Sequence, residues 1–342
     1  MQRHLDREML SLQKVFPMSR HFTIPLFIPE EGCPHRCIFC NQSHITGRQK
    51  PPGAEEVVET IESHLSTIPE DSHVEIGLLG GNFTGINKEL QKQYLKLAAP
   101  YLSSGAVSSI RVSTRPDYID DEKLALLKEH GVKTIELGAQ SMDDTVLAKA
   151  GRGHTARDTE KASLLIKQRG FRLGLQMMTG LPGDTEEGAL NTARRIIRLG
   201  AQETRIYPCL VIKNTPLEKL YLEGKYKPQS MHDAIVLVKQ LMLLFEAHNV
   251  RIIRTGLHPS EGLLSGDELL AGPFHQSFRE LVLTEIWYDI LNKLPAQNDK
   301  CLDIYVAPAA VNTATGHKAK NKKMLDGKFK QVHIHADTSL KN

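Results

Sequence analysis

The sequence predicts an α/β fold in which parallel strands alternate with helices. Short runs rich in valine, isoleucine and leucine recur from residue 21 onward. Between them lie stretches whose apolar residues are three and four positions apart, as in Val58, Ile61 and Leu65. Strand and helix follow one another six times, and strands joined by helices lie parallel in one sheet. An open doubly wound sheet and a barrel both satisfy this pattern.

Each predicted strand is a short apolar run bounded by turn residues, and each predicted helix has one apolar face. The strands, in chain order, are Ile24–Ile28, Val74–Leu79, Ser108–Ser113, Lys133–Leu137, Phe171–Met177 and Thr204–Cys209. The helices are Glu55–Ile68, Lys88–Tyr101, Asp121–His130, Arg157–Arg169, Glu186–Leu199 and His232–His248. In parallel βα folds, the chemistry gathers at the carboxyl ends of the strands.

The pattern changes after residue 250. Val250–Arg254 suits one more strand, Gly256–Gly272 is predicted to be a long loop, and Phe274–Leu291 is predicted to be a helix. A small α+β unit follows a linker that starts at Leu294. The predicted domains are therefore an N-terminal extension (1–20), the βα region (21–250), a helical extension (251–297) and a basic α+β unit (298–342).

Composition narrows the class of protein. The chain has 342 residues and a formal net charge of only +3. Its sequence has no apolar run of the roughly 18–20 residues that a membrane span needs, and its charged N-terminus does not resemble a secretion signal. We therefore expect a cytoplasmic protein with no membrane partner. Five cysteines are an odd number, which suggests metal or redox chemistry instead of a disulfide framework.

Three of those cysteines, Cys33, Cys37 and Cys40, lie on one short loop after the first predicted strand. Thiolates are soft ligands that hold iron in iron–sulfur clusters while allowing electron transfer. Three of them can ligate three corners of a [4Fe–4S] cluster and leave the fourth iron open. The alternative is a structural zinc site completed by His35 or His44.

The Cys-x3-Cys-x2-Cys spacing, with the aromatic Phe39 before the last cysteine, resembles the signature of radical S-adenosylmethionine (radical SAM) enzymes. The resemblance implies a partial (β/α)6 TIM-like barrel, a [4Fe–4S] cluster and S-adenosylmethionine on its open iron. It also implies an electron donor such as flavodoxin or ferredoxin. Reductive cleavage of the sulfonium then gives a 5′-deoxyadenosyl radical.

The resemblance extends to cofactor contacts along the chain. It places Phe39 against the adenine and Gly80-Gly81-Asn82 around the methionine amino group. The third position of this turn is often acidic in the family, whereas here it is Asn82. Other predicted cofactor-binding residues lie at the ends of predicted strands or just before them: Thr114, Gln140 and Gln176. Buried, satisfied amides are the alternative for both glutamines.

Two further segments, Thr114–Tyr118 and Arg152–Thr155, resemble the radical domain of the catalytic subunit of Elongator, which modifies transfer RNA. The resemblance covers about residues 20–290. The acetyltransferase domain of that enzyme has no counterpart in residues 291–342, so acetyl-coenzyme A chemistry does not carry over. Arg115, Arg152 and His154 are candidates for contacts with phosphate or with the cofactor carboxylate, with surface loop residues that have no role as the alternative. Cys209 is a candidate hydrogen-atom donor, with a structural thiol as the alternative.

The basic C-terminal unit resembles a KH RNA-binding module. In such modules a Gly-x-x-Gly loop grips the backbone of single-stranded nucleic acid. Here the loop begins at Gly316, and its second glycine is replaced by Ala319. Six lysines and one acid lie between residues 318 and 330, a charge pattern that attracts phosphate. A plain solvated basic face is the alternative. The predicted RNA-binding residues are Gly316, Lys318, Lys320, Lys322 and Lys323.

Together these features predict a radical SAM enzyme that modifies RNA, with transfer RNA as the expected partner. Two other functions remain open at the level of sequence. One is radical chemistry on a small molecule such as a porphyrin. The other is a non-catalytic, zinc-containing RNA-binding protein.

Overall fold

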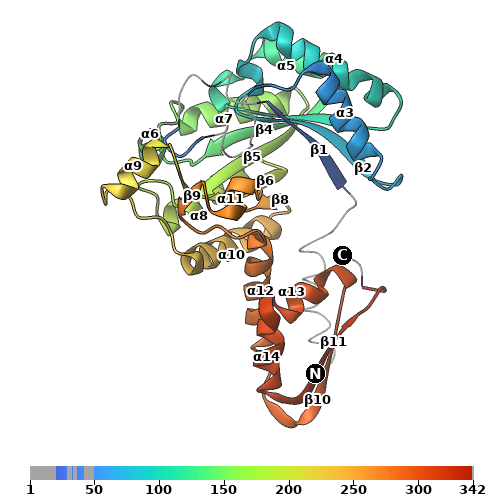
Figure 1. Ribbon diagram of the computed structural model, residues 1–342, viewed down its shortest axis with the longest axis vertical. Coiled ribbons are helices and arrows are strands. Elements are labelled where there is room, and N and C mark those ends of the chain that lie inside the picture. The colour runs from blue at the N-terminus through green and yellow to red at the C-terminus, as the bar shows by residue number, and fades with distance from the viewer. Residues whose placement is uncertain (1–20, 29–32, 34–36, 42–49, 341–342) are drawn as a thin grey trace. The chain divides into compact units, whose positions relative to one another are not determined.

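The computed structural model describes residues 21–28, 33, 37–41 and 50–340. Its main feature is a curved sheet of seven strands in the order β1-β2-β3-β4-β5-β6-β8 (Figure 1). Every neighbouring pair in this sheet is parallel. The strands are β1 (His21–Ile28), β2 (His73–Gly80), β3 (Ser109–Thr114), β4 (Val132–Gln140), β5 (Arg172–Thr179), β6 (Glu203–Pro208) and β8 (Arg251–Thr255).

Helices cover the outer side of this sheet, in the manner of half of a βα barrel (Figure 1). They are α3 (Ala54–Leu65), α4 (Lys88–Ser103), α5 (Asp121–Glu129), α6 (Asp144–Lys149), α7 (Ala156–Gln168) and α8 (Glu186–Arg198). Polar side chains in the preceding loops cap several of them. Asp120 accepts the backbone N–H of Lys123, and Thr155 forms a capping box with Asp158.

The predicted α/β fold and partial barrel are confirmed. Each of the six predicted strands coincides with one in the structure, and Val250–Arg254 corresponds to the seventh strand, β8. The core strands are buried, as in β5, where only Arg172 is exposed. This is the pattern expected of a sheet covered on both faces. The strand order places the carboxyl ends of all seven strands on one edge of the sheet.

The predicted long loop at Gly256–Gly272 contains two short elements. These are α11 (Glu261–Ser265) and β9 (Leu269–Ala271), and β9 pairs antiparallel with β7 (Val211–Ile212). The prediction of a plain loop was therefore wrong. The two strands of this pair are too short to show an alternation pattern in the sequence. The helix α9 (Pro216–Leu222) follows β7 and begins with proline at its first turn.

Contacts divide the chain into two compact units, and the sheet belongs to the one formed by residues 20–230 and 250–274. The other unit contains α10 (Met231–Ala247), α12 (Phe278–Leu291) and the C-terminal elements. Those elements are β10 (Gln297–Val306), α13 (Val311–Thr315), α14 (Lys320–Asp326) and β11 (Phe329–Ala336). The predicted domain limits at residues 20, 250 and 297 stay a prediction.

The C-terminal elements form their own small core. The strands β10 and β11 pair in parallel, and their apolar residues pack against Trp287, Leu291 and Leu325. Trp287 thus lies in a core, as a lone tryptophan usually does. In the part of the chain that the structure describes, no helix is both long enough and apolar enough to cross a membrane.

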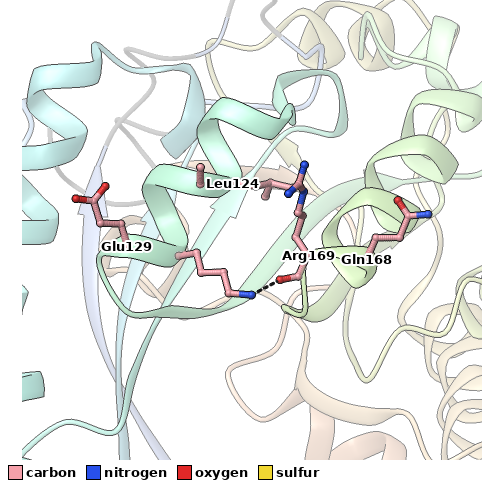
Figure 2. A pocket seen from close by; sticks show the side chains of 6 residues that line it. Leu124, Glu129, Gln168 and Arg169 are labelled. Carbon is pink, nitrogen blue, oxygen red and sulfur yellow. Dashed lines mark hydrogen bonds between the residues drawn. The ribbon is translucent and has the colours of Figure 1, made fainter.

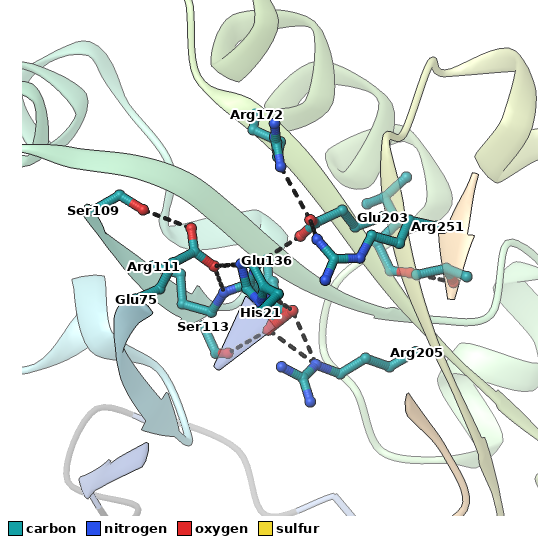
Figure 3. A network of polar contacts seen from close by, with 12 residues as sticks. His21, Glu75, Ser109, Arg111, Ser113, Glu136, Arg172, Glu203, Arg205 and Arg251 are labelled. Carbon is teal, nitrogen blue, oxygen red and sulfur yellow. Dashed lines mark hydrogen bonds and ion pairs between the residues drawn. The ribbon is translucent and has the colours of Figure 1, made fainter. Parts of the chain in front are cut away.

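Ionic side chains fill the interior of the half barrel near the amino ends of its strands (Figure 3). Arg111 on β3 is fully buried and pairs with Glu75, Glu136 and Glu203 at 2.7–2.8 Å. Arg205 on β6 shares Glu136 at 2.9 Å. The nearby guanidinium groups hold the pKa of Glu136 below its usual value, against the opposing effect of burial. This charged layer, which we call the floor network, ties β2, β3, β4 and β6 together.

Replacing Arg111 with methionine tests the floor network. The variant leaves three carboxylates buried without their shared cation, so we expect a loss of about 3–5 kcal/mol in the free energy of unfolding. Chemical denaturation followed by circular dichroism measures it. Arg169→Met is the control, since its pair with Asp121 is exposed and is worth about 1 kcal/mol or less. Equal losses in the two variants would contradict the proposed role of Arg111.

Candidate active site

The cysteine loop starts where β1 ends, at the carboxyl edge of the sheet. Cys37 is buried, while Cys33 and Cys40 are half-buried, and none of the three forms a disulfide. A turn closes between the last two, where the Cys40 N–H donates to the Cys37 carbonyl at 3.0 Å. His35 and His44, the candidate fourth ligands of a zinc site, lie outside the described residues.

Two backbone hydrogen bonds anchor the loop to the barrel. Ile38 donates its N–H to the carbonyl of Ala150 at 3.1 Å, and its own carbonyl accepts the N–H of Leu217 at 2.9 Å. The side chains of Ile38 and Phe39 pack against a buried apolar cluster that includes Met178 and Cys209. The segment Cys37–Cys40 is therefore held by the loop after α6, by α9 and by the ends of β5 and β6.

Arg152 connects the loop to the barrel electrostatically. Its Nη1 donates a hydrogen bond to Cys37 Sγ at 3.1 Å, and its Nη2 donates to the carbonyl of Gly138 at 2.6 Å. Arg152 is buried, so its charge acts in a medium of low dielectric constant. A buried guanidinium that donates to Cys37 Sγ can also donate to that sulfur when it ligates a metal.

Arg115 reinforces this positive region. It makes a bidentate pair with Asp117 and donates from Nη2 to the carbonyl of Arg152 at 2.6 Å. Among the described residues, the buried Nη1 of Arg115 and Nε of Arg152 have no hydrogen-bond partner. Buried donors without acceptors are costly, so these atoms mark a place that suits an anionic group. Burial, with Arg152 nearby, lowers the pKa of His154 to about 4, so this imidazole is neutral at neutral pH.

The turn after β2 is fixed by a close approach of two backbones. Gly80 has φ +125°, and a Cβ atom there would lie 2.1 Å from the carbonyl oxygen of Ile28. Ile28 ends β1, immediately before the cysteine loop begins. Gly81 also donates its N–H to that oxygen, at 3.4 Å. Only glycine fits at residue 80, and its local role is to hold the end of β1 against β2.

Asn82 joins this turn to the end of β3. Its Oδ1 accepts hydrogen bonds from Thr114 Oγ1 at 2.5 Å and from the Arg115 N–H at 3.2 Å. The hydroxyl group of Thr114 is also hydrogen-bonded to that of Thr84, at 2.5 Å. Asn82 and Thr114 are both buried. The predicted cofactor residues after β2 and β3 thus lie together, and the Asn82 carboxamide orients the backbone that carries Arg115.

The two glutamines also meet. Gln176 Nε2 donates to Gln140 Oε1 at 3.3 Å, from β5 to the end of β4. Gln140 has φ +63°, an unfavourable backbone conformation for a residue other than glycine, at a shift in the pairing of β4 with β5. Strained backbone of this kind often occurs at functional sites. The side chain of Gln140 lies near Gly138, whose carbonyl Arg152 holds.

Cys209 lies just beyond β6, in the apolar cluster against which Phe39 packs. Burial raises the pKa of its thiol to about 12, so the group is protonated at neutral pH. Tyr226 is the neighbour of this thiol, and its hydroxyl donates to the carbonyl of Gly180 at 2.6 Å. The Cys209 side chain is fully buried. A role for it as a hydrogen-atom donor stays a prediction.

A surface pocket of about 450 Å³ lies elsewhere, between α5 and the end of α7 (Figure 2). The residues that line it are Leu124, Ala125, Lys128, Glu129, Gln168 and Arg169. Lys128 Nζ donates across it to the carbonyl of Arg169 at 2.7 Å. None of these side chains is a thiol or an imidazole, and the pocket lies on the outer helices. It is therefore not the site of the cysteine chemistry.

In the C-terminal unit, the predicted Gly-x-x-Gly-like loop joins α13 to α14. Gly316 has φ +83°, and Lys318 and Ala319 both adopt left-handed conformations. The loop is tied to α12, because the His317 N–H donates to Thr284 Oγ1 at 3.0 Å. Ala319 thus takes a conformation that glycine adopts without strain.

The four lysines of this loop differ in their surroundings. Lys320 pairs with Glu285 and lies 4.9 Å from the centre of the Tyr288 ring. Lys322 pairs with Asp326 at 3.3 Å. Lys318 and Lys323 are exposed, and no ion pair joins them to another described residue. These two lysines are the ones available to an external anion.

The structure thus brings together the predicted residues from β1 to β6 at one edge of the sheet and keeps the lysines in a separate unit. The contact of Arg152 with Cys37 could not be derived from the sequence, because the two residues are 115 positions apart. Sequence analysis missed Tyr226 and the floor network. The floor network could have been suspected from the charged residues that lie inside the predicted strands Val74–Leu79 and Lys133–Leu137.

Comparison with known proteins identifies the class. Residues 27–196 match the family model of the radical SAM superfamily, and residues 201–288 match that of the radical SAM C-terminal domain. An uncharacterized protein of Methanocaldococcus jannaschii is 30% identical over 64% of this chain and 70% of its own length. The tRNA uridine(34) acetyltransferase of the same organism is 28% identical over 61% of this chain. This chain covers only 46% of that relative.

Human Elongator complex protein 3 is 26% identical over 62% of this chain and 42% of its own length. Among solved structures, the archaeal Methanocaldococcus infernus Elp3 with an N-terminal deletion has a TM-score of 0.61 at 21% identity. The match covers 79% of this chain and 63% of the Elp3 chain. At this level of identity the structural match supports the fold.

The contact between β1 and β2 can be tested by Gly80→Ala. The added methyl group would collide with the Ile28 carbonyl, so we expect a loss of at least about 2 kcal/mol in the free energy of unfolding. Gly105→Ala is the matched control. Gly105 also has a positive φ, but a Cβ atom there would have no neighbour within 4 Å, so this variant should lose only about 1 kcal/mol. Similar losses measured by urea denaturation would refute the close-approach argument.

Proposed function

Because this chain belongs to the radical SAM superfamily of enzymes, we propose that it binds a [4Fe–4S] cluster and uses it to cleave S-adenosylmethionine. In this proposal Cys33, Cys37 and Cys40 ligate three irons. The observation that carries it is the placement of these thiols at the carboxyl edge of the barrel, with Arg152 donating to Cys37 Sγ.

The residues at this edge suit such a group. The donors are soft thiols that are not tied up in disulfides, and iron–sulfur clusters are held by thiolates. Hydrogen bonds to the sulfur atoms tune the reduction potential of a cluster, and Arg152 already makes one. The buried Nη1 of Arg115 and Nε of Arg152 offer two further donors to a thiolate-bound cluster or to a carboxylate.

The protein side of the mechanism is positioning. When bound, the cluster supplies one electron, received from a donor of the flavodoxin or ferredoxin class, which splits S-adenosylmethionine into methionine and a 5′-deoxyadenosyl radical. Phe39, which precedes the last cysteine, packs against the apolar cluster around Cys209 and would lie against the adenine. Asn82 and Thr114 fix the backbone at the ends of β2 and β3, next to Arg115. Gln140 and Gln176 offer amide groups at the ends of β4 and β5.

We further propose that the substrate is RNA, and that transfer RNA is the class to test first. Two of the relatives are named for transfer RNA uridine modification or for Elongator. The basic loop of the C-terminal unit adds a second, independent argument, because Lys318 and Lys323 are exposed there. This chain spans less than half of those relatives, so acetyl transfer is not part of the proposal. A cytoplasmic location agrees with this substrate.

Anaerobic reconstitution tests the proposed chemistry. The full chain is supplied with iron and sulfide, reduced with dithionite and given S-adenosylmethionine with or without bulk transfer RNA. We expect 5′-deoxyadenosine to form in the wild type and its release to be faster with transfer RNA. Cys37→Ser should abolish the product, since serine is a poor ligand for iron, whereas Cys301→Ser should retain it because Cys301 is exposed in the other unit.

Each outcome points to a different function. Product formation that transfer RNA leaves unchanged would favour a small-molecule substrate. Zinc in place of iron and sulfide in the anaerobically purified protein would favour the non-catalytic zinc protein. Full activity of Cys37→Ser would contradict the cluster assignment.

The lysine loop is tested by the double variant Lys318→Glu, Lys323→Glu. If both side chains contact phosphates, binding of transfer RNA should weaken, and the slope of log affinity against log salt should fall by about 1 to 2. Fluorescence anisotropy at several salt concentrations measures this slope. The control Lys96→Glu, Lys161→Glu makes the same change in net charge on α4 and α7. An equal effect of both double variants would show that the basic loop has no special role.

A further inference from the structure

A cluster of metal-ligating side chains lies at the opposite end of the barrel from the cysteine loop. It consists of His21 at the start of β1 and of His73 and Glu75 on β2. One nitrogen or oxygen atom from each of the three residues lies within 4.8 Å of the others. These residues belong neither to the cysteine site nor to the predicted cofactor contacts.

The register of the sheet produces this cluster. His21 pairs directly with His73 across the two parallel strands. Residues two apart on a strand point to the same face, so Glu75 lies on the same side as His73. The two imidazole rings stack, with centroids 4.9 Å apart. The three side chains are thus brought together by two neighbouring strands and do not depend on a long loop.

His21 provides the observation that points to a ligand. Its side chain is only 8% exposed, and its Nε2 lies 3.0 Å from Glu75 Oε2. Yet Nε2 has no aligned hydrogen-bond partner among the described residues. The separation of Nε2 and Oε2 is one that two ligands of a single zinc ion can have. A buried nitrogen left in this state is otherwise costly.

Glu75 is held as a metal-binding carboxylate usually is. Ser109 donates to its Oε1 at 2.6 Å, and Arg111 Nε donates to its Oε2 at 2.9 Å. Such outer hydrogen bonds orient ligating side chains in metal sites. Arg111 is shared among three carboxylates, so Glu75 is only partly neutralised by it. The floor network therefore fixes Glu75 in place, with Arg111 Nη2 also 2.8 Å from its Oε2 (Figure 3).

We propose that His21, His73 and Glu75 form a zinc-class divalent metal site that joins β1 to β2 at the floor of the barrel. Two imidazoles and one carboxylate are a ligand set that zinc accepts readily, with water in the remaining position. The sheet order makes β1 an edge strand, and its other end carries the cysteine loop. A metal at this place holds the strand on which that loop is mounted. The site is separate from the proposed function; only its test rests on that function, and the iron and sulfide content of each sample shows whether a cluster occupies the loop cysteines.

The test uses the full chain carrying its iron–sulfur cluster, so that the three loop cysteines are occupied. The protein is dialysed against a small excess of Zn²⁺, and bound zinc is measured by mass spectrometry together with the zinc X-ray absorption spectrum. Three proteins are compared: wild type, His73→Ala and the control His232→Ala. His73 and His232 are both exposed, so neither replacement should disturb folding, which circular dichroism verifies.

We expect wild type and His232→Ala to bind one more zinc ion per chain than His73→Ala. The absorption spectrum should show nitrogen and oxygen ligands at about 2.0–2.2 Å and no sulfur at about 2.3 Å. Glu75→Gln should also lose this zinc. Equal zinc contents in the wild type and the His73→Ala protein would overturn the proposal, as would sulfur ligation of the bound zinc or no binding by the wild type.

Discussion

The parallel pairing of β1 with β2 fixes the point from which the cysteine loop starts. Eight consecutive residues of each strand are in register, and the cysteine loop continues directly from the end of β1. At that end, Gly80 has no side chain, so the backbone of β2 can approach the backbone of β1 at Ile28. At the other end, His21 faces His73 across the same two strands. The position of the thiols is thus set by how an edge strand is fastened along its whole length.

The barrel separates two kinds of charge. At the floor, Arg111 and Arg205 face buried glutamates, so both guanidinium groups form internal ion pairs. At the carboxyl edge, Arg115 and Arg152 retain buried donor atoms without partners in the described structure, close to the thiol of Cys37. The ion pairs of the floor network stabilise the sheet, whereas the unpartnered donor atoms Arg115 Nη1 and Arg152 Nε can bind an anionic group. This difference distinguishes the candidate active site from the floor, although both lie within one half barrel.

Sequence patterns predicted the strands and the main helices because each carries its own periodic signal. They also located the cysteine loop, since three thiols within eight positions are conspicuous. What they could not predict were pairings over long separations, such as Arg152 with Cys37 or Arg111 with Glu203, which are 115 and 92 positions apart. The role of Gly80 was also hidden, because a glycine after a strand has many explanations until the neighbouring backbone is seen. The short pair β7–β9 had no periodic signal at all.

In the proposed function, three thiolates hold a cluster whose fourth iron is open to S-adenosylmethionine. Electron paramagnetic resonance of the reconstituted, dithionite-reduced protein, recorded before and after addition of S-adenosylmethionine, tests it most directly. The account predicts the signal of a reduced [4Fe–4S] cluster whose spectrum changes when the compound binds. A protein without that signal, or with a signal that S-adenosylmethionine leaves unaltered, would contradict it.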